Sequence, residues 1–283
     1  MSDAADRNLT HLSPAAGRLG AVFARPKVVA IACVILLAGL GWAYLALLTA
    51  GMSDTLSAFE VLCRAMADST LRPTTIALIA LMWGAMTLAM MLPSAAPMIY
   101  TYAEIADTAA RKGERIVSPF VLAAGYTLVW LGFASIATVA QIALTRVALL
   151  DTSLMAASGL FSGAIFIAAG VYQFSAFKHA CLRQCQHPFP FFFANWKTTP
   201  RGVFRLGLKQ GLFCLGCCWA MMLVMFAVGV MNVIWMAALG MVMTIEKIGS
   251  GRRFSHAVGV VLIVAGVVFI VTATAPHWPA PAN

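Results

Sequence analysis

The sequence predicts an all-α fold, a polytopic transmembrane helical bundle of about seven spans whose N-terminus lies in the cytoplasm. Of its 283 residues, 61% are hydrophobic and only 10% are charged. In a soluble domain roughly a quarter of the residues are charged, so the apolar surface of this chain needs lipid as its solvent. Several apolar stretches reach about 20 residues, the length that crosses a bilayer core of about 30 Å as a helix. Basic residues concentrate in alternate loops, which is typical of a multi-pass protein.

Hydropathy divides the chain into a cytoplasmic segment 1–27, a transmembrane domain 28–274 and a short tail 275–283. The expected spans are 28–50, 75–98, 119–145, 154–176, 207–228, 232–247 and 256–274. The apolar stretch from Gly211 to Ile245 is too long for one helix. Gly229 and Asn232 supply turn residues, so we predict a tight helical hairpin there, with a re-entrant pair as the alternative.

The distribution of lysine and arginine sets the orientation. The N-terminal segment and the loops after the second, fourth and sixth spans are basic, whereas the intervening connections hold few cations. This alternation places the N-terminus in the cytoplasm and the C-terminus outside. The formal net charge of +9 is then a consequence of topology, and no nucleic-acid partner is expected. The first span is longer than the apolar region of a signal peptide, so we expect a retained anchor.

Five cysteines form two groups with helical spacing. Cys181 and Cys185 are four residues apart after the fourth span, and Cys214 precedes Cys217 and Cys218 by three and four residues in the fifth. Such spacings place side chains on one helix face. Thiolates are soft ligands: a tetrahedral set suits Zn²⁺, and two or three suit Cu(I). Both groups are expected on the cytoplasmic side, so they can meet around one ion. The simpler alternative is that the cysteines of each group are small buried residues that only pack in the helix bundle.

Methionines repeat every four residues in the second span, at Met82, Met86 and Met90, and Met91 follows. Thioether sulfur also binds Cu(I), although a methionine stripe in a helix is commonly packing material. Pro93 lies in the same span, where a proline frees a backbone carbonyl one turn earlier and kinks the helix.

Few polar residues lie within the expected spans. Glu246 and Lys247 close the sixth span, and their simplest interpretation is that they anchor the helix at the membrane interface. A proton or ligand role is the alternative. Gln141, Gln173 and Asn232 are expected to form hydrogen bonds between helices.

Several of these motifs occur together over most of the chain from the second to the sixth span. They are Trp83 to Pro93 with the Met-Met-Leu-Pro-Ser run, Tyr172-Gln173 followed by Lys178, Cys181 and Cys185, Gly211 to Trp219, Gly229 to Asn232 with Trp235-Met236, and Glu246-Lys247. This combination resembles a family of bacterial integral membrane proteins described as predicted metal-binding and sometimes labelled copper chaperones. The resemblance implies a location in the bacterial inner membrane. It also implies a metal site at Cys181, Cys185, Cys217 and Cys218, with Met90, Met91 and Glu246 near it.

The first functional hypothesis is a membrane protein that binds a soft metal ion for transfer or transport, with Cu(I) as the first choice and zinc as the second. The candidate ligands are Cys181, Cys185, Cys214, Cys217, Cys218, Met86, Met90, Met91 and Glu246. The expected partners are the lipid bilayer and a protein that donates or accepts the metal. The alternatives are a membrane thiol-redox enzyme coupled to quinone and a non-catalytic scaffold in a membrane complex. The chain has no Walker-type sequence, which argues against ATP-driven transport by this chain alone.

Overall fold

A computed structural model describes residues 73–114, 116–147, 149–150, 158–230, 232–248 and 252–274, together with the short stretches 35–36, 39–40 and 42–43. The long elements in these ranges are eight helices: α4 (Pro73–Arg111), α5 (Pro119–Arg146), α6 (Gly159–Tyr172), α7 (Ala176–Gln186), α8 (Pro188–Asn195), α9 (Pro200–Val228), α10 (Val233–Ile248) and α11 (Arg252–Thr274). The predicted all-α class is confirmed. The segment 1–27, most of the first expected span and the tail 275–283 lie outside the described residues.

Four of the described helices, α4, α5, α9 and α11, are long and apolar enough to cross a membrane, and the bent pair α6 and α7 makes a fifth if it counts as one span. The expected spans 119–145, 207–228 and 256–274 lie within α5, α9 and α11. Helix α4 continues past the expected end at residue 98 to Arg111, and α10 has only 16 residues. The total of seven spans stays a prediction.

The fourth expected span differs from the structure at its C-terminal end. Helix α6 stops at Tyr172, and α7 starts at Ala176 with its axis turned by 65°. The Oγ of Ser175 accepts a hydrogen bond from the backbone N–H of Phe177 at 3.2 Å and caps the new helix. This turn lays α7 against α9, which brings the first cysteine pair to the second group.

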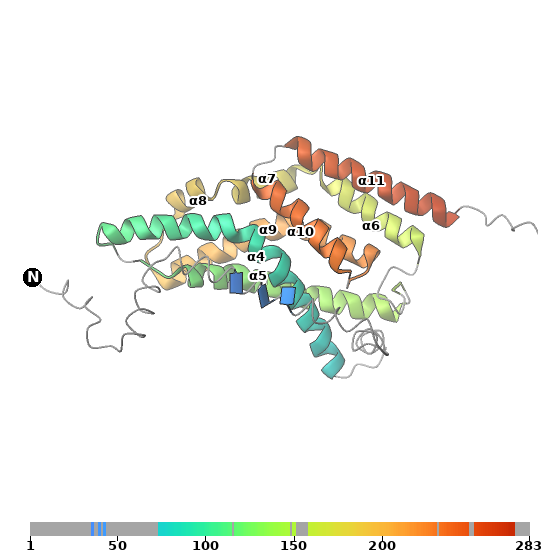
Figure 1. Cartoon of the computed structure of the whole chain (residues 1–283), viewed down its shortest axis with the longest axis horizontal. Helices are drawn as coiled ribbons and strands as arrows, with labels where there is room; N and C mark the ends of the chain where they lie inside the picture. Colours follow the sequence, from blue (N-terminus) through green and yellow to red (C-terminus); the bar gives the residue numbers. More distant parts are fainter. Residues whose placement is uncertain are drawn as a thin grey trace, which may run out of the picture.

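Glycines let two helix pairs approach closely. A Cβ added at Gly207 of α9 would lie 2.1 Å from the carbonyl oxygen of Leu122 in α5, and one added at Gly125 would lie 2.3 Å from the carbonyl oxygen of Phe204. The backbones of α5 and α9 are therefore in contact, as small residues permit in helix bundles. Helices α6 and α11 also pack backbone to backbone, and they run side by side in Figure 1.

Helix α4 bends in the middle, as Figure 1 shows. Pro93 and Pro97 lie inside it. Pro93 has no N–H to donate to the carbonyl of Ala89, and the indole Nε1 of Trp42 donates to this carbonyl instead, at 2.8 Å. The kink that the prolines predict is therefore present, and a side chain from outside the helix satisfies one of the freed carbonyls.

The turn between α9 and α10 falls where the sequence predicts it. Gly229 has φ of 98°, a left-handed conformation that glycine adopts without strain. The side chain of Asn232 is exposed and accepts from the N–H of Trp235, so it caps α10, and its predicted role between helices is wrong. Gln141, by contrast, accepts from the indole of Trp83 on α4 at 2.8 Å, as predicted. Helix α10 packs against α4, α7 and α9.

Candidate metal centre

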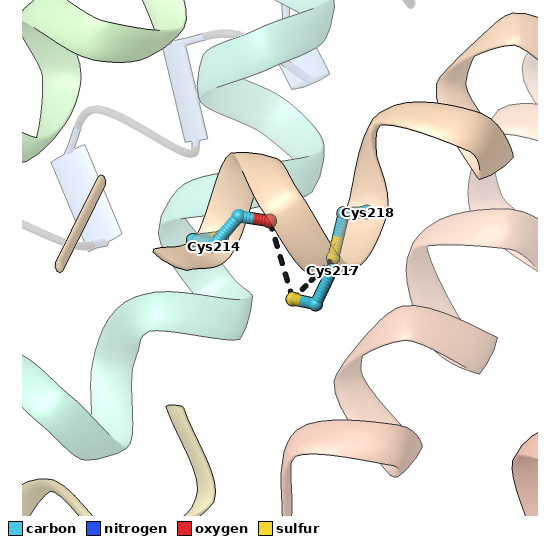
Figure 2. A group of neighbouring side chains, drawn as sticks. All are labelled: Cys214, Cys217 and Cys218. Atoms are coloured by element: carbon cyan, nitrogen blue, oxygen red, sulfur yellow. Dashed lines mark hydrogen bonds between the residues drawn. The ribbon is translucent and has the colours of Figure 1, made fainter. Parts of the chain in front are cut away.

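Three cysteines of α9 form a compact group inside the bundle. The sulfur atoms of Cys214, Cys217 and Cys218 all lie within 4.8 Å of one another, and Figure 2 shows them on one turn of the helix. The Cys217 and Cys218 sulfurs are 3.3 Å apart. Each of the three residues exposes 2% or less of its surface. The predicted spacing therefore does gather these thiols at one place, shielded from solvent.

Helix α7 places a fourth thiol beside this group. Cys185 is half-buried, and its side chain interacts with those of Cys214 and Cys217. Cys181, one turn earlier on α7, packs against the backbone of α9, because a Cβ added at Gly216 would lie 2.6 Å from its sulfur. Helix α7 thus delivers Cys185 to the centre and places Cys181 beside it.

Cys214 is the residue at which four helices converge. Its sulfur lies 3.0 Å from the hydroxyl of Tyr126 on α5 and 3.0 Å from the ammonium of Lys247 on α10. The same ammonium donates to the hydroxyl of Ser94 on α4 at 2.6 Å. A cation that faces a sulfur in a buried site stabilises the thiolate form, because charge-assisted hydrogen bonds are stronger than neutral ones.

The interpretation of Glu246 and Lys247 as interfacial anchors is wrong. Glu246 is 1% exposed and Lys247 is 6% exposed, because the end of α10 is enclosed by α4, α7 and α9. Both oxygens of Glu246 accept from the ammonium of Lys178 on α7, at 2.8 and 3.0 Å. Lys178 itself is fully buried, so this is an ion pair without solvent contact.

A polar network extends from this ion pair and holds α7 in place. The Lys178 ammonium also donates to the side-chain oxygen of Gln173, whose Nε2 donates to the sulfur of Met221 on α9 at 2.9 Å. Gln186 donates to the backbone carbonyl of Glu246 at 2.7 Å. The predicted role of Gln173 between helices is confirmed. The network fixes α7 to both α9 and α10.

The candidate methionines are buried in α4. Met86, Met90 and Met91 expose 2% of their surface or less. Met90 packs against α10, where a Cβ added at Gly240 would lie 3.7 Å from its Cγ. The carbonyl of Met91 accepts from Tyr126, the residue whose hydroxyl also contacts Cys214. Tyr126 therefore links the backbone of the proline-kinked part of α4 to Cys214, and ligation by methionine sulfur stays a prediction.

A small cavity of about 20 Å³ adjoins the centre, and Cys185, Cys214, Lys247 and Gln210 are among the residues that line it. Gln210 is 2% exposed, and both polar atoms of its amide have no hydrogen-bond partner among the described residues. Such a group costs about 1–3 kcal/mol when it is left unpaired, so the amide calls for a partner in this cavity, and a water molecule would fit there.

Sequence reasoning did not single out Tyr126 or Gln210. Two signals pointed to them. A tyrosine in the middle of an apolar span needs a partner for its hydroxyl, and Tyr126 follows Gly125, where α9 approaches closely. Gln210 precedes Cys214 by four residues, so the two share a face of α9.

Residues 80–269 of the chain match the PpoB2 family, which is described as a copper chaperone. The matched range contains the five cysteines of the two groups, the three candidate methionines and the two buried ion-pair partners. No curated protein and no solved structure matches the chain significantly. The match covers well over half of the sequence and confirms the resemblance stated above. The chain therefore belongs to the PpoB2 copper chaperone family.

Proposed function

We propose that this chain is a multi-pass protein of the bacterial inner membrane that binds Cu(I) in a buried thiolate centre and passes it to a partner protein. The ligands are drawn from Cys185, Cys214, Cys217 and Cys218. One observation carries the proposal: three sulfurs within 4.8 Å of one another are buried in a bundle whose family is described as a copper chaperone. The basic loops support a cytoplasmic N-terminus.

The donor set favours Cu(I) over harder ions. Soft thiolate ligands select Cu(I), Zn²⁺ and iron–sulfur clusters, whereas Mg²⁺ and Ca²⁺ need oxygen ligands. Glu246 is the neighbour of Lys247 in the sequence, and its carboxylate is already paired with Lys178. The sulfurs are therefore the available ligands, and Glu246 supports the centre through α7.

Charge balance supports a monovalent ion. Cu(I) with two thiolates carries one net negative charge, which the ammonium of Lys247 cancels. Zn²⁺ with four thiolates carries two negative charges, of which one would remain uncompensated in a buried site. Uncompensated buried charge costs several kcal/mol. The thiol of Cys217 donates to the carbonyl of Cys214 at 3.2 Å, which fits a centre in which part of the sulfurs stay protonated.

The methionines extend the sulfur-lined region away from the thiols. Met86, Met90 and Met91 on α4 are buried in the same core as the cysteines. Thioethers bind Cu(I) without adding negative charge, so they suit a weaker site that the ion occupies in transit. In this proposal the methionines take part in transfer, whereas the thiolates hold the ion.

Metal analysis of the purified protein tests the proposal. After loading under reducing conditions, we expect about one copper per chain and coordination by sulfur alone in X-ray absorption. A variant with Cys185, Cys214, Cys217 and Cys218 all changed to Ser should retain less than a tenth of this copper. Unchanged stoichiometric copper in that variant would refute the thiolate centre. Thiols that cycle through a disulfide instead would favour the redox alternative.

Lys247→Met is expected to weaken Cu(I) binding about 30-fold. Methionine keeps the length and volume of the side chain but removes the charge that faces Cys214 at 3.0 Å. Loss of a buried compensating charge costs about 2 kcal/mol or more, which corresponds to this factor. Competition with a chromophoric Cu(I) chelator measures the affinity. The exposed Lys209 on α9 provides the matched control, and Lys209→Met should bind like the wild type. Equal affinity of Lys247→Met would contradict the counter-ion role.

A further inference from the structure

The small cavity beside Cys214 reaches from the thiol centre to residues that lie one helical turn away from it. On α9 it is lined by Gln210, four residues before Cys214, and on α4 by Met98, four residues after Ser94. Four residues correspond to about one turn, or 6 Å of helical rise. The two residues belong to different helices and line one cavity, so they mark the same approach to the centre.

The cysteines differ in how much of them a small molecule can reach. Cys185 is half-buried and lines the cavity, whereas Cys214, Cys217 and Cys218 expose 2%, 1% and 1% of their surface. An incoming carrier therefore meets the thiol of Cys185 first. Cys185 also interacts with Cys214 and Cys217, so an ion bound to it is already beside the deeper sulfurs.

The lining of the cavity fits the exchange of a soft ion. Met98 is 6% exposed and supplies a thioether, a neutral soft ligand. The side chain of Gln210 offers a donor and an acceptor that no described residue satisfies. A volume of about 20 Å³ is close to that of one water-sized molecule, so it admits an ion or a water but excludes an organic carrier.

We propose that this cavity is the loading vestibule of the thiolate centre, where a low-molecular-weight thiol carrier delivers Cu(I) to Cys185 and Met98. The carrier stays at the mouth. A bond forms between Cu(I) and the sulfur of Cys185, one bond from Cu(I) to a carrier sulfur breaks, and the proton of the Cys185 thiol leaves with the released carrier thiol. The ion then forms a bond to the thiolate of Cys214 as its bond to Met98 breaks, and Gln210 pairs with the water or ligand that occupies the vestibule during exchange.

This inference rests on the proposed function, and loading kinetics separate the two. The full-length protein in detergent is mixed with the Cu(I)–glutathione complex, and copper per chain is measured in timed aliquots after rapid gel filtration. The variants are Met98→Leu and Gln210→Leu, which conserve volume approximately. Met222→Leu is the control, because Met222 is a fully buried methionine of α9 that is not among the residues lining the cavity.

We expect Met98→Leu and Gln210→Leu to load at least 10-fold more slowly than the wild type and to reach the same final copper content, while Met222→Leu loads normally. Wild-type loading rates in both vestibule variants would overturn the inference and leave the thiolate centre intact. A lower final copper content would also overturn it, because the two residues would then belong to the centre itself. Absence of copper uptake by the wild type would reject the proposed function, and the vestibule with it.

Discussion

Cys214→Ser is expected to lower the affinity for Cu(I) by at least about 100-fold. Cys214 is the thiol that contacts Lys247 and Tyr126, and it shares the compact group with Cys217 and Cys218. Serine keeps the shape and the hydrogen-bonding capacity, but its hydroxyl is a poor ligand for a soft ion. Losing an outer-sphere partner of a metal typically costs 10–100-fold in affinity, so losing this ligand costs more.

The matched control is Cys181→Ser. Cys181 is buried on α7 and packs against Gly216, but its sulfur is not part of the compact group. Chelator competition should give Cys181→Ser an affinity within a few-fold of the wild type. Equal losses in Cys181→Ser and Cys214→Ser would contradict the geometry of the centre, because Cys181 would then be a ligand as well.

Lys178→Met is expected to destabilise the protein by about 3–5 kcal/mol. The substitution leaves the carboxylate of Glu246 buried without its partner, and breaking a buried ion pair from one side has a cost of this size. Glu246→Met should lower the stability by a similar amount, because it leaves the Lys178 ammonium without its carboxylate partner. Thermal unfolding of the detergent-solubilised protein, followed by tryptophan fluorescence at one scan rate, measures the loss as a lower Tm.

The double variant Lys178→Met with Glu246→Met separates charge from packing. Replacing both partners of a buried pair by apolar residues is often neutral, so the double variant should recover much of the lost stability. The exposed pair of Asp107 and Arg111 on α4 is the control. Asp107→Asn should change the stability by about 0–1 kcal/mol. Additive losses in the double variant would show that the two residues do not act as a pair.

The apolar helices could be predicted from the sequence because lipid imposes a simple rule on them. Helix α5 begins at the predicted Pro119, and Gly229 forms the predicted turn. The break between α6 and α7 could not be predicted, because the residues around Gln173 look like a continuing span. Tertiary contacts decide the break: Gln173 is buried against Lys178 and Met221, and Ser175 starts a new helix in another direction.

The cysteine group could be predicted in part. Spacing along α9 placed Cys214 with Cys217 and Cys218, because residues three and four apart share a helix face. Spacing along α7 could not tell Cys181 from Cys185, since the 65° turn between α6 and α7 and the packing of α7 on α9 decide which of them reaches the group. The charges of Glu246 and Lys247 were misread for a related reason. Charged residues at the end of a span usually reach water, and only the packing of α10 shows that these do not.

The position of Lys247 has a consequence for biosynthesis. During translation the chain grows from its N-terminus, so all four thiols of the centre emerge well before the ammonium that balances them. Until α10 packs against α9 and α4, the thiols lack the ammonium of Lys247 and the helix that encloses this side of the site. A nascent or truncated chain that ends before α10 therefore exposes sulfur ligands without the means to retain a metal selectively. Helix α10, which precedes only α11 among the described helices, is the one that completes the centre.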